Sequence, residues 1–219
     1  MRSLAQPAVL WRAAIAGVLT AAAGYPRLAN WTQRPDALWF LDAALGWAGF
    51  VMWAAVLAWH RRHSGHEVFP RQIPGHLWWT AGALGVGGAI ISYHWGDPLL
   101  RQLAPTDFPR TPGAWVEHLL FSLALEQVFL CFAPVAFLVR LWPNVNVAAT
   151  GTVLFSLFVF TLKLDAGAAA VPGLVLAGMF LFRALHSGVT VWLYLRGGAW
   201  LVWFFATLLL TRLWFSFAG

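Results

Sequence analysis

The stretch that decides the fold is residues 115–142, WVEHLLFSLALEQVFLCFAPVAFLVRLW. Glu117, Glu126 and Arg140 are its only charged residues, and the rest is almost entirely apolar. A helix needs about 20 apolar residues to cross the hydrocarbon core of a bilayer, and this run is longer. The stretch therefore predicts a membrane-spanning helix that carries one carboxylate, that of Glu126, near its middle.

The composition of the whole chain agrees with this prediction. Of the 219 residues, 60% are hydrophobic and only 10% are charged, and the mean hydropathy is +0.69. A soluble domain carries about 25% charged residues, because they coat its water-facing surface. This composition excludes a water-soluble globular domain and favours an integral membrane protein.

Outward from residues 115–142, six further apolar runs are separated by short segments that contain proline, glycine or charged residues. The seven predicted spans are Pro7–Gly24, Ala37–Trp59, Leu77–Tyr93, Trp115–Trp142, Val147–Leu162, Ala168–Leu195 and Ala199–Phe217. We therefore expect an all-α polytopic transmembrane helical bundle of about seven spans, forming a single integral membrane domain over residues 1–219. Because Arg12 interrupts the first run and six spans follow it, we expect a retained helix there rather than a signal peptide.

The positive charges predict orientation rather than nucleic-acid binding. The net charge is +6, but the arginines lie at predicted helix ends and in loops instead of forming one patch. The most basic loop, residues 60–66, is placed in the cytoplasm by the positive-inside rule, which puts the N-terminus there as well. Richness in alanine, arginine and tryptophan is typical of GC-rich bacterial genomes, so we expect a bacterial cytoplasmic (inner) membrane.

The third predicted span carries small residues at intervals of four. Ala81, Gly85 and Ala89 fall on one helical face, and such a stripe lets two helix backbones approach closely. We expect this face to pack against another helix of the bundle.

Ionisable side chains at membrane depth are costly, so they are candidates for function. Glu126 lies in the fourth span, Arg183 and His186 lie on one face of the sixth, and Lys163 ends the fifth. In one interpretation Glu126, Arg183 and His186 meet in a polar pocket inside the bundle. In the other, which we favour, Glu126 and Arg183 form a buried ion pair that fixes the helix register without chemistry. We expect Lys163 to extend toward the interface.

A second group of candidates lies in the basic loop. His60, His63 and His66 with Glu67 have a spacing that suits a metal site. Because the group stands alone, we favour a solvated loop at the lipid headgroups and predict no metal. The single cysteine, Cys131, provides neither a disulfide nor a cysteine-based metal site.

From Trp115 onward, the succession of spans and three short motifs resemble a known family. The first stretch is Glu126-Gln127-Val128-Phe129-Leu130-Cys131, the second is Val159-Phe160-Thr161-Leu162-Lys163, and the third is Tyr194-Leu195-Arg196-Gly197-Gly198-Ala199-Trp200 followed by Thr207 and Thr211. They resemble the CPBP intramembrane proteases, the CAAX-protease and bacteriocin-processing group. Residues 117–122 give an alternative register for the first motif.

The resemblance implies a CPBP-like fold for the C-terminal half and a hydrolytic ancestry. In that family a Glu-Glu-x-x-x-Arg motif, a Phe-x-x-x-His motif and a His-x-x-x-Asn motif supply the active site. Here Gln127, Cys131 and Lys163 replace the second Glu, the Arg and the first His, and Thr207 and Thr211 replace the last pair. A general base needs a correctly placed proton acceptor, and most of these positions have lost theirs.

The sequence thus leads to three functional hypotheses. The first is a non-catalytic CPBP-like protein, a pseudoenzyme, that acts as an accessory or assembly subunit of a membrane complex with a membrane-protein partner or a second copy. The second is a divergent intramembrane CAAX-type endopeptidase with Glu126 as general base and His186 as an auxiliary group. The third is a cofactor-binding subunit that holds haem or a pigment on a membrane histidine, although no cofactor is predicted under the first two.

Overall fold

The computed structural model describes residues 4, 6–32, 34–103, 108–163 and 172–215, and all regular structure among them is helical. The α-helices in chain order are α1 (Pro7–Trp31), α2 (Pro35–Ser64), α3 (Gly75–Ile91), α4 (Asp97–Leu103), α5 (Pro112–Phe121), α6 (Ala133–Leu141), α7 (Val145–Lys163) and α8 (Gly173–Leu210). Three π-helical segments, Ser92–Gly96, Ser122–Glu126 and Val128–Phe132, continue the helices between α3 and α4 and between α5 and α6. A 3₁₀ turn, Thr211–Leu213, follows α8. The all-α prediction is confirmed for the described residues.

Proline and glycine set several of these boundaries. Proline occupies the first position of α2 and of α5, where a helix needs no backbone N–H. Thr111 caps α5, because its hydroxyl accepts a hydrogen bond from the Ala114 N–H at 3.2 Å. Helix α2 ends at Ser64 because Gly65 adopts the left-handed conformation with φ of 74°.

Helix α8 consists of two helical parts joined by a break. Gly197 and Gly198 have non-helical backbone angles, and Gly198 has φ of 64° and ψ of −159°. The rings of His186 and Phe205, on opposite sides of the break, lie 5.6 Å apart. In a straight helix, 19 residues would separate them by about 28 Å along the axis. The second part of α8 therefore folds back along the first.

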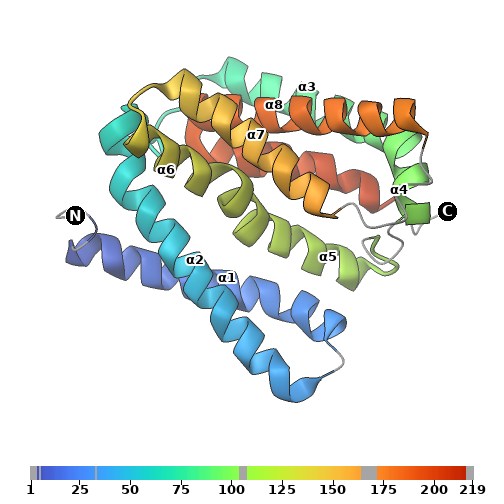
Figure 1. The fold of residues 1–219 in the computed structure, drawn as a ribbon, viewed down its shortest axis with the longest axis horizontal. Coiled ribbons are helices and arrows are strands. Elements are labelled where there is room, and N and C mark those ends of the chain that lie inside the picture. Colours follow the sequence, from blue (N-terminus) through green and yellow to red (C-terminus); the bar gives the residue numbers. More distant parts are fainter. Residues whose placement is uncertain (1–3, 5, 33, 104–107, 164–171, 216–219) are drawn as a thin grey trace.

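The helices form one bundle that includes this reversed pair (Figure 1). α1 and α2 make an antiparallel hairpin on one side, and α2 contacts α6. α7 contacts both α6 and α8, and α3 lies against α8 on the opposite side. The α5–α6 region thus lies in the interior, where it meets α1, α2, α7 and α8.

Among the residues that the structure describes, five helical stretches are long and apolar enough to cross a membrane. They are Pro7–Asn30, Pro35–Ser64, Pro112–Leu141, Val145–Leu162 and Gly173–Leu213. The last contains the break in α8, and α3 falls just short of this length with 17 residues. The chain has the make-up of a multi-pass membrane protein, with five such stretches where the sequence predicts about seven spans.

The outer surface of the bundle is apolar. Trp79 is 83% exposed and Leu174 is 88% exposed, and Trp11, Trp39 and Trp47 are also largely exposed. Soluble proteins rarely present so many large apolar side chains to water. These side chains face the positions that lipid occupies around an embedded bundle.

The predicted limits of the first two spans were too narrow. α1 continues past Gly24, through Pro26, to Trp31, and α2 continues past Trp59 to Ser64. As a result, the basic loop predicted to begin at His60 starts only at Gly65. The charged end of α2 stays helical because it packs on the bundle on one face, and the His60 side chain is fully buried.

The small-residue stripe of α3 lies where it was predicted. Ala81, Gly85 and Ala89 are buried, and α3 contacts α8. A Cβ atom on Gly85 would lie 2.9 Å from the Leu208 Cβ and 3.2 Å from the Phe205 carbonyl oxygen. The absence of a side chain therefore sets how closely these two helices approach.

Candidate functional site

A cavity of about 260 Å³ lies inside the bundle, among the end of α3, the α5–α6 region, α7 and both parts of α8. Its apolar lining includes Leu100, Leu130, Phe160 and Met179. The polar and ionisable residues that line it are Ser92, Asp97, His118, Ser122, Glu126, Gln127, Cys131, Ser156, Arg183, His186, Ser187, Thr190 and Arg212. This concentration of polar groups inside an otherwise apolar bundle makes it the candidate functional site.

The local helix geometry points to the same place. Each of the three π-helical segments among the described residues contributes to the lining: Ser92 and Trp95 from the first, Ser122 and Glu126 from the second, and Cys131 from the third. An extra residue in a helical turn is unfavourable, and π-helical turns are found mostly at functional sites. The helices are thus distorted where they border the cavity.

The structure brings together three of the four ionisable candidates from the sequence. Glu126, Arg183 and His186 all line the cavity. Arg183 and Glu126 are near enough to interact electrostatically, but the described residues contain no direct ion pair or hydrogen bond between them. The Arg183 Nε atom is buried and has no hydrogen-bond partner in the described part of the chain. Glu126 and Arg183 therefore border one shared space without pairing directly.

The fourth candidate, Lys163, ends α7, and its side chain lies outside the described part of the structure. Whether it belongs to a polar pocket or an ion pair with Glu126 and Arg183 stays a prediction.

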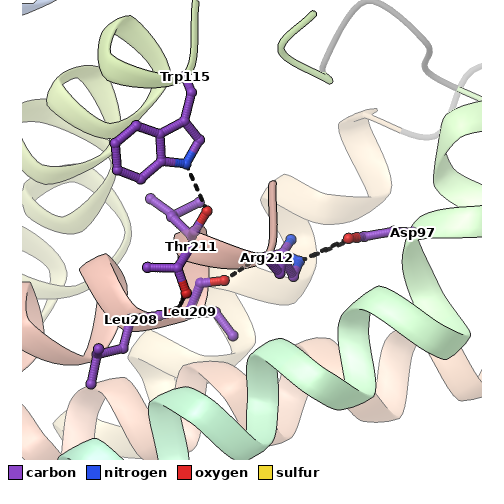
Figure 2. Close-up of polar contacts among 7 residues, drawn as sticks. Asp97, Trp115, Leu208, Leu209, Thr211 and Arg212 are labelled. Carbon is purple, nitrogen blue, oxygen red and sulfur yellow. Dashed lines mark hydrogen bonds and ion pairs between the residues drawn. The ribbon is translucent and has the colours of Figure 1, made fainter. Parts of the chain in front are cut away.

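A buried ion pair lies at the end of the cavity formed by α4 and the 3₁₀ turn (Figure 2). The Arg212 Nε donates to both carboxylate oxygens of Asp97, at 3.2 and 3.1 Å, and the Arg212 guanidinium also donates to the Leu209 carbonyl at 2.9 Å. Asp97 is only 1% exposed. Burial raises the pKa of the Asp97 carboxyl above its ordinary value, and the opposite effects of Arg212 and Arg101 are smaller.

The Asp97–Arg212 end of the cavity is also hydrogen-bonded to α5. The indole N–H of Trp115 donates to the Leu210 carbonyl at 2.9 Å; Figure 2 draws this bond as the dashed line from the Trp115 ring. Leu210 is the last residue of α8, so its carbonyl has no helical partner of its own. Trp115 therefore anchors the end of α8 and positions Arg212 at the cavity.

Serine side chains supply further hydrogen-bonding groups to the cavity. Ser187 of α8 donates to Ser156 of α7 at 2.7 Å, and both side chains are buried. Ser92 is also buried, and its hydroxyl has no hydrogen-bond partner in the described part of the structure. Ser156 lines the cavity, and so does Ser122 from the α5–α6 region.

His118 reaches the cavity from α5 and is held by α1. The Arg27 guanidinium is hydrogen-bonded to the His118 Nδ1, and Arg27 also lies 4.9 Å above the Phe121 ring. One residue earlier, Glu117 accepts a hydrogen bond from Asn30 at 2.6 Å. These contacts fix the first turns of α5 against α1.

The residues of the quoted motifs divide into two groups. Glu126, Gln127 and Cys131 line the cavity. Thr207 and Thr211 do not, and each hydroxyl donates to a carbonyl of its own helix, at 2.8 and 2.6 Å. The side chains at the third motif therefore stabilise α8 locally rather than face the cavity.

The histidines near the end of α2 do not gather into a site. His60 is buried against the Tyr194 ring at 4.5 Å, whereas His66 and Glu67 are exposed. Within the described ranges, no group of three His, Cys, Asp or Glu side chains has the arrangement of a metal site.

The sequence pointed to Glu126, Arg183 and His186 because each is ionisable and lies within a span. It missed Asp97, which lies just beyond the predicted third span, and Arg212, which lies near the end of the predicted seventh span; the two pair across 115 positions. Comparison of the chain with protein-family models, with curated proteins and with solved structures found no match. The CPBP resemblance therefore rests on the succession of spans and the quoted motifs.

Proposed function

We propose that the chain is a non-catalytic membrane protein of CPBP-like architecture that binds a polar group in its intramembrane cavity and acts as an accessory subunit of a membrane complex. The observation that carries the binding role is the pair of opposite charges, Glu126 and Arg183, that line one cavity without pairing directly. A register-fixing ion pair would neutralise both charges, whereas a binding site keeps them available.

The surroundings of Glu126 support a non-catalytic role. Its neighbour Gln127 cannot accept a proton as a carboxylate does, and the Thr207 and Thr211 hydroxyls are bonded to their own helix. Hydrolysis by an activated water needs a proton acceptor and groups that stabilise the developing charge. One carboxylate remains without the partners that the resemblance associates with catalysis.

A second candidate function, a divergent intramembrane endopeptidase, is favoured by one specific observation. Glu126 and His186 line the same cavity, so a base and an auxiliary imidazole share one space. The His186 ring packs on Phe205 and lies one helical turn from Arg183.

We further propose seven membrane crossings, with the N-terminus in the cytoplasm of a bacterial cell. α3 with its π-helical continuation supplies one crossing, and the two parts of α8 supply two. The basic residues at the end of α2, with Arg61 and Arg62 in its last turn, support the cytoplasmic side.

A cleavage assay on purified protein separates the two functions. The wild-type chain and Glu126→Gln are incubated in detergent with a peptide mixture, and products are followed by mass spectrometry. Glu117→Gln serves as the matched control, because Glu117 lies on the same helix but outside the cavity. We expect no cleavage by any of the three proteins and co-purification of a membrane partner in mild detergent. Cleavage by the wild type and Glu117→Gln that Glu126→Gln abolishes contradicts the non-catalytic proposal.

A further inference from the structure

The charges at the cavity define the chemistry of what binds there. Asp97 and Arg212 neutralise one another at one end, and His118 is bonded to Arg27. This leaves Glu126 and Arg183 as the charged side chains that face the cavity without a direct partner in the described part of the chain. Their separation exceeds an ion-pair contact, since no N–O distance between them falls within 4.0 Å.

We propose that the cavity binds a zwitterionic group, with an ammonium at Glu126 and a phosphate or carboxylate at Arg183; this inference rests on the proposed binding function. A simple anion would pair with Arg183 but would be repelled by the Glu126 carboxylate. A simple cation would pair with Glu126 but would be repelled by Arg183. A buried charge without a counter-charge is strongly unfavourable. A ligand that carries both signs can pair with both side chains at once.

The hydrogen-bonding groups suit the same ligand. Arginine binds phosphate and carboxylate through several N–H donors, and the Arg183 Nε is an unused one. A carboxylate such as Glu126 accepts hydrogen bonds from an ammonium but repels an anion. The hydroxyl of Ser92, also without a partner in the described residues, can donate or accept at the cavity wall.

The size of the cavity restricts the bound part. Its volume of about 260 Å³ lies below the range of about 300–1,000 Å³ that is usual for drug-sized ligands. There is room for a small zwitterion or for one lipid headgroup, but not for acyl chains.

One side of the cavity borders the outer face of the bundle, so the acyl chains of a bound lipid would remain outside the cavity. Trp95 lines the cavity yet is 54% exposed, so its ring lies between the cavity and the outer face. It packs on Gly178 of α8, where a Cβ would lie 2.6 Å from the indole. The ligand is therefore either a lipid headgroup that enters beside Trp95 or a free zwitterion.

Lipid retention measured by native mass spectrometry tests this proposal. The full chain in detergent is exposed to equal amounts of phosphatidylethanolamine, which is zwitterionic with N–H donors, and phosphatidylglycerol, which is anionic. We expect the wild type to retain the ethanolamine lipid about tenfold more, a ratio of the size that one charge-assisted hydrogen bond provides. Glu126→Gln leaves Arg183 alone and should reverse the preference, whereas Glu117→Gln should keep it.

A second variant keeps the test informative if Glu126→Gln does not fold. Arg183→Gln removes the anion-binding group, so this variant should lose the preference between the two lipids and retain less of both.

Thermal stabilisation of the lipid-free protein by soluble phosphoethanolamine then distinguishes a free zwitterion from a lipid headgroup. A rise in melting temperature indicates that the free zwitterion suffices, and an unchanged melting temperature assigns the site to the lipid. Equal retention of both lipids by the wild type, without stabilisation by phosphoethanolamine, overturns the proposal. The lipid result does not depend on the cleavage assay. The zwitterion site can therefore fail while the non-catalytic role still holds.

Discussion

The Asp97–Arg212 pair shows how a polar contact can hold the cavity together at the scale of single residues. Its two hydrogen bonds join α4 to the turn after α8, and Asp97 is almost fully buried. By contrast, Arg61 and Glu67 form an exposed pair with an N–O distance of 3.7 Å. The two pairs have the same chemistry but different surroundings, and this makes them a useful comparison.

Removing one member of the buried pair should destabilise the protein strongly. We expect Asp97→Asn to lower the free energy of unfolding by about 3–5 kcal/mol, because Arg212, whose side chain is only 16% exposed, loses its counter-charge. Glu67→Gln should change it by less than about 1 kcal/mol, since exposed pairs contribute little. Unfolding of the purified variants in detergent measures both, and similar small losses for the two would mean that the Asp97–Arg212 pair is not buried in solution.

At the scale of helices, the break in α8 decides whether the cavity exists. Both parts of α8 line the cavity, so the reversal at Gly197–Gly198 is what brings Arg183 and Arg212 to one space. The Ala199 N–H donates to the Val68 carbonyl at 2.8 Å, which ties the break to the segment after α2.

Gly198→Ala should therefore be strongly destabilising. Its φ of 64° and ψ of −159° are almost exclusive to glycine, and a Cβ would lie 2.3 Å from the Val68 carbonyl oxygen. The backbone strain alone costs about 1–3 kcal/mol. Gly188→Ala, in the regular part of the same helix with open space around it, should be neutral or slightly stabilising. Thermal unfolding of the two variants tests this, and equal melting temperatures would contradict the break.

The α3–α8 contact allows a second matched comparison at this scale. Gly85→Val adds atoms where a Cβ already lies 2.9 Å from Leu208, whereas Gly87→Val, two residues further along α3, meets nothing within 4 Å. Both changes place the same residue type in the same helix. We expect Gly85→Val to cost about 1–3 kcal/mol more than Gly87→Val, because it overpacks a close helix contact. Unfolding that does not distinguish the two variants would show that α3 is not packed this way.

For the whole molecule, the sequence predicts the helices well and their mutual arrangement poorly. Long apolar runs predict helices because backbone groups in lipid must be bonded within the segment. The ends are harder: α1 extends to Trp31 because Arg27, a polar residue that suggests a helix end, bonds to His118 of α5. Such contacts join residues far apart in the chain.

The candidate site shows the same division. Glu126, Arg183 and His186 could be identified from the sequence because ionisable side chains are conspicuous in apolar spans. The pairing of Asp97 with Arg212 and the burial of His60 against Tyr194 depend on how the helices assemble. Neither residue type nor spacing along the chain contains that information.

The central claim is that Glu126 and Arg183 face a cavity instead of forming a direct ion pair. A double-mutant cycle with Glu126→Gln, Arg183→Gln and both together measures their coupling from the free energy of unfolding. The same cycle on Asp97 and Arg212, with Asp97→Asn and Arg212→Gln, provides the internal standard for a direct buried pair. We predict that the Glu126–Arg183 coupling is clearly smaller than the Asp97–Arg212 coupling. A Glu126–Arg183 coupling as large as that standard would mean a closed ion pair and would contradict the account.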